Sequence, residues 1–235
     1  EYIVAERVPA GDRLVRVSGE VGELDARFIA PDEPSGLKVL RSDGAGGAIM
    51  VLALETSIVV RRVDSALVPF GRVSWERAGR YAMPVDANVD GDGHLRVMVE
   101  TGISGTADFS VHWLHYDRDL SLVDERLIPY YGWFATQADG TSLIASPVGL
   151  VRVSAKGAVG LPMPFGRELD GELTPGLRAV AATETGFVVG YARGGSAARE
   201  YLWGHSDVSG FVGCSAAGLC LGQDPSACDI DAQCV

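Results

Sequence analysis

The sequence predicts an all-β fold, a β-propeller-like array of about five four-stranded repeats of roughly 47 residues, followed by a small disulfide-rich tail. Three observations lead to this prediction. Many short apolar runs are separated by turn residues, one local pattern recurs along the chain, and all four cysteines lie within the last 22 residues.

The composition indicates a packed domain made of strands and turns. Of the 235 residues, 47% are hydrophobic, and 30 glycines and 11 prolines separate apolar runs such as residues 48–54 and 187–192. No run approaches the about 18–20 apolar residues that a membrane helix needs, so no membrane span is predicted. The net charge of −11 repels phosphate backbones and excludes nucleic acid and anionic membrane surfaces as partners, and it leaves small cations and basic partners open.

A repeat is visible where a short strand meets an acidic or polar turn that is closed by glycine and followed by an apolar strand. It occurs at residues 38–44, 83–93, 134–140 and 180–186. The closing glycines, aligned as Gly44, Gly93, Gly140 and Gly186, are 49, 47 and 46 residues apart. Repeats of 40–50 residues with four strands each are typical of propeller blades, because one small sheet buries both faces only when neighbours stack on it.

The units expected from this period cover residues 1–30, 37–73, 80–128, 133–166 and 178–213. The first unit lacks its first strand, which predicts either that an upstream segment has been removed or that the chain is part of a larger ring or assembly. A β-sandwich or a β-solenoid is the alternative. Strands are expected near residues 48–54, 57–64, 95–100, 109–117, 142–146, 149–154, 187–192 and 199–207.

One turn has the chemistry of a metal loop. Oxygen-bearing side chains occupy every second position over residues 86–92, with glycines between the later ones: Asp86, Asn88, Asp90 and Asp92. Alternating carboxylates and amides on a tight turn bring oxygen atoms together, as Ca2+ requires. The loop predicts a structural calcium site, with a solvated Asx-rich turn that needs no metal as the alternative.

Residues 88–99, NVDGDGHLRVMV, resemble the calcium loop of FG-GAP/VCBS propeller repeats, which follows the pattern D-x-D-G-D-G-x-x-D-L. The resemblance implies calcium bound between the first and second strands of a blade. Arg96 departs from the pattern, because it stands where those repeats have their last aspartate and so places a cation beside the expected ion.

The tail at residues 214–235 carries the four cysteines Cys214, Cys220, Cys228 and Cys234. An even number of cysteines in a short segment rich in small polar residues predicts two disulfides and an oxidising compartment, with all three connectivities open. A zinc site is the alternative, although the gaps of five, seven and five residues exceed the usual ligand spacing. The tail also resembles short Cys-rich modules of secreted and cell-surface proteins from myxobacteria.

Several residue groups with possible chemistry are better explained by packing. His112 and His115 lie on opposite faces of one expected strand, without a third metal ligand nearby in sequence. Neighbouring carboxylates such as Asp124 and Glu125, or Asp170 and Glu172, do not by themselves define a glycosidase pair. Aromatic side chains that would suit a sugar-stacking surface are expected to pack between blades: Trp75, Trp133, Trp203, Tyr130, Tyr131 and Tyr201.

Two functions are open at this point. The first is a secreted, cell-surface or periplasmic module without catalysis, serving adhesion, binding or scaffolding with a protein or glycan partner. The second is an extracytoplasmic carbohydrate-active enzyme, which requires two or three acids converging in one pocket near the axis of the array. No catalytic residues are assigned, and Ca2+ is the expected cofactor.

Overall fold

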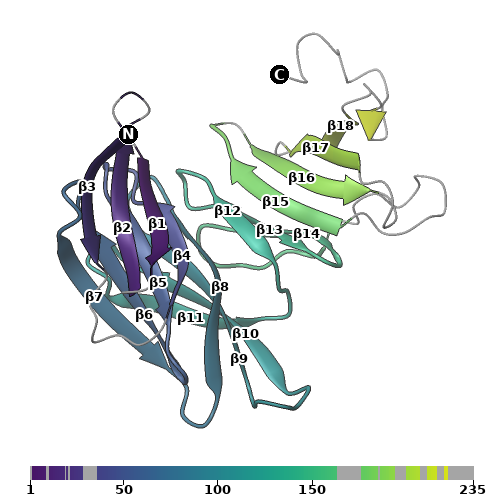
Figure 1. Ribbon diagram of the computed structural model, residues 1–235. Helices are drawn as coiled ribbons and strands as arrows, with labels where there is room; N and C mark the ends of the chain where they lie inside the picture. The colour runs from purple at the N-terminus through teal and green to yellow at the C-terminus, as the bar shows by residue number, and fades with distance from the viewer. Residues whose placement is uncertain are drawn as a thin grey trace. The chain divides into compact units, whose positions relative to one another are not determined.

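The computed structural model describes residues 2–8, 11–18, 20, 22–28, 36–162, 176–184, 186–193, 200–206, 211–215 and 220–221. These residues form antiparallel strands and turns and no helix, which confirms the all-β prediction (Figure 1). Within them, no helix is long and apolar enough to cross a membrane. The chain divides into two compact units, Glu1–Pro129 and Tyr130–Val235.

The first unit contains three antiparallel sheets, each built from consecutive strands. The first sheet consists of β1 (Tyr2–Val8), β2 (Gly11–Ser18) and β3 (Gly22–Phe28). The second sheet consists of β4 (Leu37–Ser42), β5 (Ala48–Ala53), β6 (Ser57–Val63) and β7 (Pro69–Glu76). The third consists of β8 (Tyr81–Val89), β9 (Leu95–Gly102), β10 (Phe109–Tyr116) and β11 (Leu122–Ile128).

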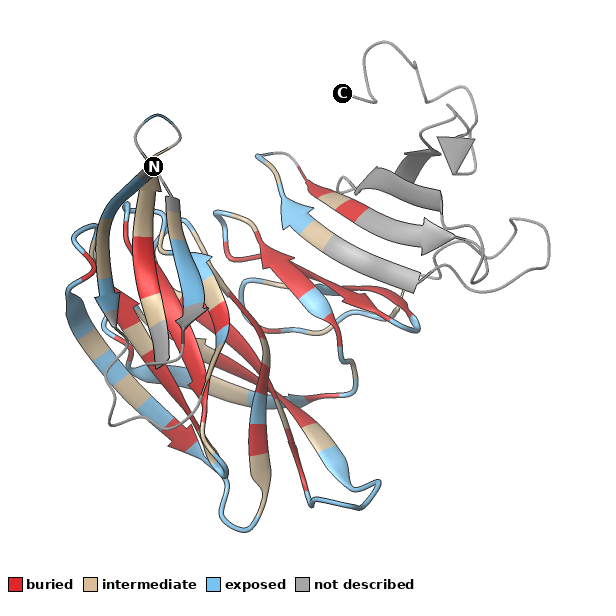
Figure 2. Ribbon diagram, in the orientation of Figure 1, coloured by how far each residue is buried: buried red, intermediate tan, exposed pale blue. Residues whose placement is uncertain are grey.

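The inner part of the second sheet is buried on both faces, as its inner strand β5 shows. Every residue of β5 is buried (Figure 2). Ile49 and Val51 belong to a cluster shared with the third sheet, whereas Met50 and Leu52 belong to a cluster shared with the first sheet. Because side chains alternate across a strand, the continuous apolar run of β5 serves two cores at once. The three sheets of this unit are therefore stacked face to face.

The first strands of the two four-stranded sheets lie against each other. β4 contacts β8, and the guanidinium of Arg41 on β4 forms an ion pair of 2.5 Å with Asp86 on β8. Asp86 is only 2% exposed, whereas the Arg41 side chain is 42% exposed, so the pair joins the sheets at the boundary between core and solvent.

The second unit repeats this arrangement with β12 (Trp133–Thr136), β13 (Ser142–Ser146) and β14 (Gly149–Val153) in one sheet. Its other sheet contains β15 (Gly176–Ala182), β16 (Phe187–Arg193), β17 (Glu200–Ser206), β18 (Phe211–Ser215) and β19 (Cys220–Leu221). Ala135 and Leu143 of the first sheet share a core with Phe187 and Val189 of the second. Here too, the first strands β12 and β15 are in contact.

The eight strand positions expected from the apolar runs are confirmed to within two residues at either end. The boundary expected between residues 213 and 214 falls inside β18, whose residue Cys214 is the register partner of Cys220 on β19. Cys228 and Cys234 lie outside the described residues, and the two disulfides stay a prediction.

Candidate functional site

The site is built from hairpin turns that share one hydrogen-bond pattern. In the turn between β4 and β5, the Asp43 N–H donates to the carbonyl of Gly47, and Asp43 Oδ1 accepts from the N–H groups of Ala45 and Gly47. In the turn between β8 and β9, Asp90 makes the same bonds with Asp92 and His94. Such Asx turns explain why an acidic residue begins both loops.

The turn between β6 and β7 and the turn between β10 and β11 use the same device. Asp64 Oδ1 accepts from the N–H groups two and four residues ahead, and Asp117 Oδ1 does likewise. The fourth residue of each of these turns, Leu67 or Leu120, has a left-handed φ of 61° or 64°. A non-glycine residue rarely adopts this conformation. Both leucines are buried, so the apolar anchor under the turn compensates for the strain.

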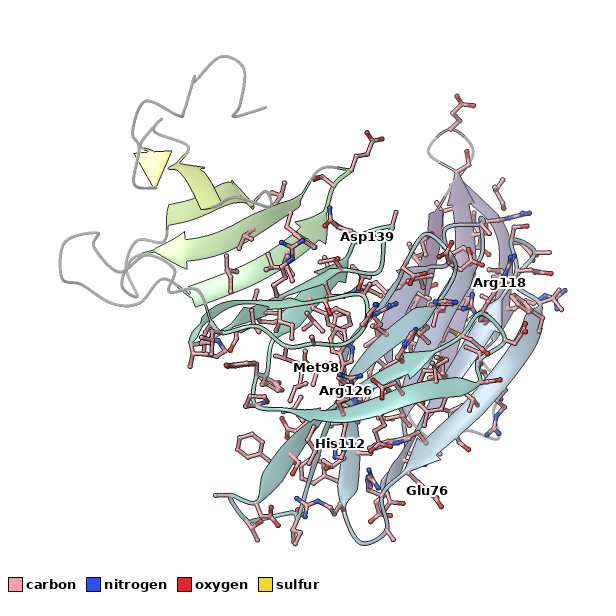
Figure 3. All side chains as sticks on the ribbon, turned by 180° about the vertical axis from the view of Figure 1, so that it is seen from behind. Glu76, Met98, His112, Arg118, Arg126 and Asp139 are labelled. Carbon is pink, nitrogen blue, oxygen red and sulfur yellow. The ribbon has the colours of Figure 1, made fainter. Side chains whose placement is uncertain are left out.

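In a four-stranded antiparallel sheet, the turn after the first strand and the turn after the third strand lie at the same end. These turns of the second and third sheets together line a cavity of about 480 Å3. We call this cavity the turn-end pocket. Its lining includes Phe70, several glycines and seven charged residues, five of them acidic: Asp43, Asp64, Asp90, Asp92, Asp119, Arg62 and Arg118. Arg118 is labelled in Figure 3. The sequence shows each acidic turn separately, but only the stacking of sheets brings them together.

Arg62 is the buried cation of the turn-end pocket. It is 4% exposed, and its Nη2 donates a hydrogen bond of 2.6 Å to the carbonyl of Gly93 in the neighbouring sheet. Its Nε is buried and has no hydrogen-bond partner. Burial lowers the pKa of this guanidinium and the charge of Arg118 lowers it further, while Asp43 is the strongest opposing influence. Arg62 therefore fixes one wall of the pocket and brings donor groups to it.

Two of the four predicted calcium ligands, Asp86 and Asp90, are paired with guanidinium groups. Asp90 Oδ2 accepts a 2.8 Å hydrogen bond from Arg96, in an ion pair whose side chains are both 4% exposed. Asp86 is paired with Arg41, Asn88 lies on β8, and Asp92 is exposed in the turn. The Arg96 guanidinium thus takes the place beside Asp90 that the resemblance assigns to a cation.

As arranged, these residues do not fit a calcium ion. Among the described residues there is no group of three or more His, Cys, Asp or Glu side chains that could hold a metal. Calcium at this loop stays a prediction, and it requires Asp86 and Asp90 to exchange guanidinium partners for the ion.

A second polar cluster lies between β7, β9, β10 and β11. His112 Nδ1 is 3.1 Å from Glu125 Oε1, and His112 Nε2 is 3.2 Å from the hydroxyl of Thr101. Glu125 also accepts a hydrogen bond from the indole of Trp75 and pairs with Arg77. The sequence pattern did not reveal this cluster, because its members are far apart in the chain. Thr101, His112 and Glu125 meet by strand pairing within the third sheet, and Trp75 and Arg77 join them when the sheets stack.

The order of carboxylate, imidazole and hydroxyl resembles a nucleophile with its base. Thr101, however, is 0% exposed and His112 is 5% exposed, so a substrate has no access to the hydroxyl. Burial lowers the pKa of His112, against the hydrogen bond to Glu125, which raises it. Burial raises the pKa of Glu125, but Trp75, Arg77 and His112 together bring it below its usual value. The cluster is a buried imidazole hydrogen-bonded to a carboxylate and a hydroxyl, which suits packing between sheets.

The remaining candidates from the sequence are spread over different environments. Trp75 is 8% exposed and packs in the core between the second and third sheets, as expected for packing. Trp133 and Tyr131 are each 45% exposed. Asp124 forms an ion pair with Arg126. It does not form a catalytic carboxylate pair with Glu125. Asp170, Glu172 and the side chains of Tyr201 and Trp203 lie outside the described residues.

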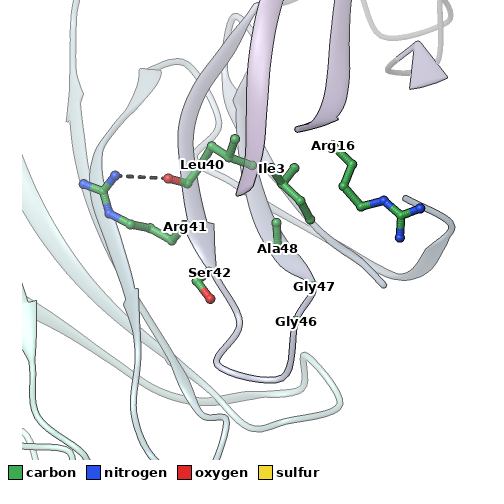
Figure 4. A pocket seen from close by; sticks show the side chains of 8 residues that line it. All are labelled: Ile3, Arg16, Leu40, Arg41, Ser42, Gly46, Gly47 and Ala48. Atoms are coloured by element: carbon green, nitrogen blue, oxygen red, sulfur yellow. Dashed lines mark hydrogen bonds between the residues drawn. The ribbon is translucent and has the colours of Figure 1, made fainter. Parts of the chain in front are cut away.

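A smaller cavity of about 320 Å3 lies at the first and second sheets (Figure 4). Its floor is apolar, with Ile3, Leu40 and Ala48, and Arg16 and Arg41 stand at opposite sides. No carboxylate lines it, so it lacks the converging acids that a glycoside hydrolase requires.

Comparison with protein-family models finds no family that matches the chain, and comparison with curated proteins finds no significant match.

Proposed function

We propose that this chain is a binding, adhesion or scaffold module without catalytic activity, built from sheets arranged as in a β-propeller. The observation that carries the proposal is the turn-end pocket, which combines turns from two neighbouring sheets into one polar surface. Among the described residues, the arrangement that most resembles a catalytic relay contains Thr101 and His112, and both are buried. A surface that is preformed by rigid hairpins favours recognition.

The propeller arrangement is supported by two features that occur in both units. Consecutive sheets share a core across their faces, and the first strand of a sheet contacts the first strand of the next. Strands near the axis of a propeller are related in this way. An experimental structure of the full chain tests the arrangement, and first strands that do not surround a common axis would contradict it.

We further propose that the protein works outside the cytoplasm, where disulfides in its tail would stabilise it. Alkylation of the denatured, unreduced protein from its native source should label none of the four cysteines. Fractionation of the same cells should place the protein in the periplasm, on the surface or in the medium. Free thiols together with a cytoplasmic location would contradict this part of the proposal.

The absence of catalysis is tested by incubating the purified chain with polysaccharides and oligosaccharides and measuring new reducing ends. We expect no release above a heat-denatured control. Release that depends on acidic residues of the turn-end pocket would instead support the carbohydrate-active enzyme.

A further inference from the structure

We propose that the turn-end pocket binds a neutral carbohydrate. This inference rests on the proposed binding function and names the class of ligand. A sugar hydroxyl both donates and accepts hydrogen bonds, so it suits a wall that carries carboxylate acceptors beside guanidinium donors. The turn-end pocket has this mixture, with Asp92 and Asp119 exposed at the turns and Arg62 and Arg118 beside them.

Arg62 is the observation that points to a ligand and not only to an acidic surface. Its guanidinium is held at the pocket wall by the bond to Gly93, while its buried Nε has no partner. A buried donor without an acceptor costs free energy. Because this Nε is buried, a sugar hydroxyl in the pocket would reach it through a trapped water, which supplies the acceptor that Nε lacks.

Phe70 supplies the apolar contact that sugar recognition needs. It lines the pocket from β7 and is 60% exposed, although large aromatic side chains are usually well buried. The face of an aromatic ring carries negative charge density, which attracts the C–H groups on the flat side of a pyranose ring. Phe70 therefore stacks against the sugar ring, and the aspartates accept hydrogen bonds from the sugar hydroxyls.

The charge and size of the pocket narrow the ligand further. Five aspartates against two arginines leave the lining acidic, which disfavours sulfated, sialylated or otherwise anionic sugars. Its volume of about 480 Å3 lies in the range of small-ligand sites. A basic peptide is the competing ligand, but it would bring a cation against Arg62.

The test uses the full chain and a panel of immobilised neutral pyranose oligosaccharides, with sulfated and sialylated counterparts and a lysine-rich peptide as separate arms. We expect binding to neutral sugars and at least tenfold weaker binding by Phe70→Ala, a loss of about 1.4 kcal/mol. Asp92→Asn should also weaken binding. Phe109→Ala, at a residue that is 59% exposed and does not line the pocket, is the matched control and should bind as the parent does.

Each other outcome has a clear meaning. Binding to no neutral sugar, binding to the lysine-rich peptide alone, or equal losses for Phe70→Ala and Phe109→Ala would overturn the carbohydrate assignment. If a protein partner binds and none of the pocket variants weakens it, the pocket assignment fails while the binding module stands. If the neutral sugar is bound and cleaved, the pocket assignment stands and the non-enzymatic function fails.

Discussion

The first turns of the second and third sheets share the same aspartate hydrogen bonds but have different surroundings. Asp43 and Asp90 cap their loops with matching hydrogen bonds. Six residues after each aspartate, the second sheet has the buried Ile49 and the third has the buried Arg96, which pairs with Asp90. The Asx hydrogen bonds alone are thus sufficient for the turn, and the ion pair is an addition that only one sheet carries.

Removing the charge of Asp90 should give the largest difference between the two turns. Asp90→Asn keeps an oxygen for the backbone bonds but leaves Arg96 buried without its counter-ion, so we expect the free energy of unfolding to fall by about 3–5 kcal/mol. Asp43→Asn should cost only about 1 kcal/mol, because Asp43 acts on the buried Arg62 through its charge and not through a direct ion pair. Urea denaturation of both variants measures the difference.

The double variant Asp90→Asn/Arg96→Ile is the control for this experiment. It copies the chemistry of the Ile49 turn and should recover most of the lost stability, because the unpaired cation is gone. Equal losses for Asp43→Asn and Asp90→Asn would show that the buried ion pair contributes nothing particular to the third sheet.

Calcium binding is a second property expected to differ between the two turns. If the ion binds at residues 86–92, it stabilises the folded chain by about 2.7 kcal/mol at a hundredfold excess over its dissociation constant, and chelation should lower the melting temperature. Arg96→Ile should strengthen the calcium effect, because it removes the cation that competes for Asp90. Superimposable calorimetric transitions with and without chelator, in both proteins, would remove the calcium prediction.

Gly47 marks a steric difference between the turns. A Cβ at Gly47 would lie 2.2 Å from the carbonyl oxygen of Val63, whereas the matching position in the other turn carries the side chain of His94. We expect Gly47→Ala to destabilise the protein by about 1–3 kcal/mol through overpacking. His94→Ala should have a smaller effect, and thermal melts that rank the two variants the other way would refute this explanation.

The pH dependence of stability should arise from the third sheet, which carries two histidines of lowered pKa. Burial lowers the pKa of His112 and His115, and Arg96 and His94 lower that of His115 further. The unfolded chain then binds more protons, so stability should fall as the pH drops below about 6.5 and level off below the folded pKa values. Glu125 stays ionised in this window because its own pKa is lowered.

This last effect is the smallest, at most about 1.4 kcal/mol per pH unit for each proton. Melting temperatures of the parent and of His115→Gln between pH 7.5 and 5 measure it. The variant should show the shallower slope, and parallel slopes would mean that His115 takes no part.

The alignment of the closing glycines differs from the structure in one of the turns. Gly44 was matched with Gly93, but the hydrogen bonds place Gly46 at the equivalent position, so the alignment was wrong by two residues. Both Gly44 and Gly46 have positive φ, and composition does not tell them apart. Once Gly46 is used, the spacing to Gly93 and on to Gly140 becomes 47 residues each time.

The sequence by itself determined the strands and the turns, because side-chain alternation and Asx capping act over a few residues. It indicated the loop at residues 86–92 and noted Arg96 as its departure. Only the tertiary structure decided that Arg96 pairs with Asp90, that His112 meets Glu125 and Trp75, and that four turns enclose one pocket. The Asp90–Arg96 and His112–Glu125 contacts form between neighbouring strands of the third sheet, whereas Trp75 and the turns of the pocket are brought together by how the sheets stack.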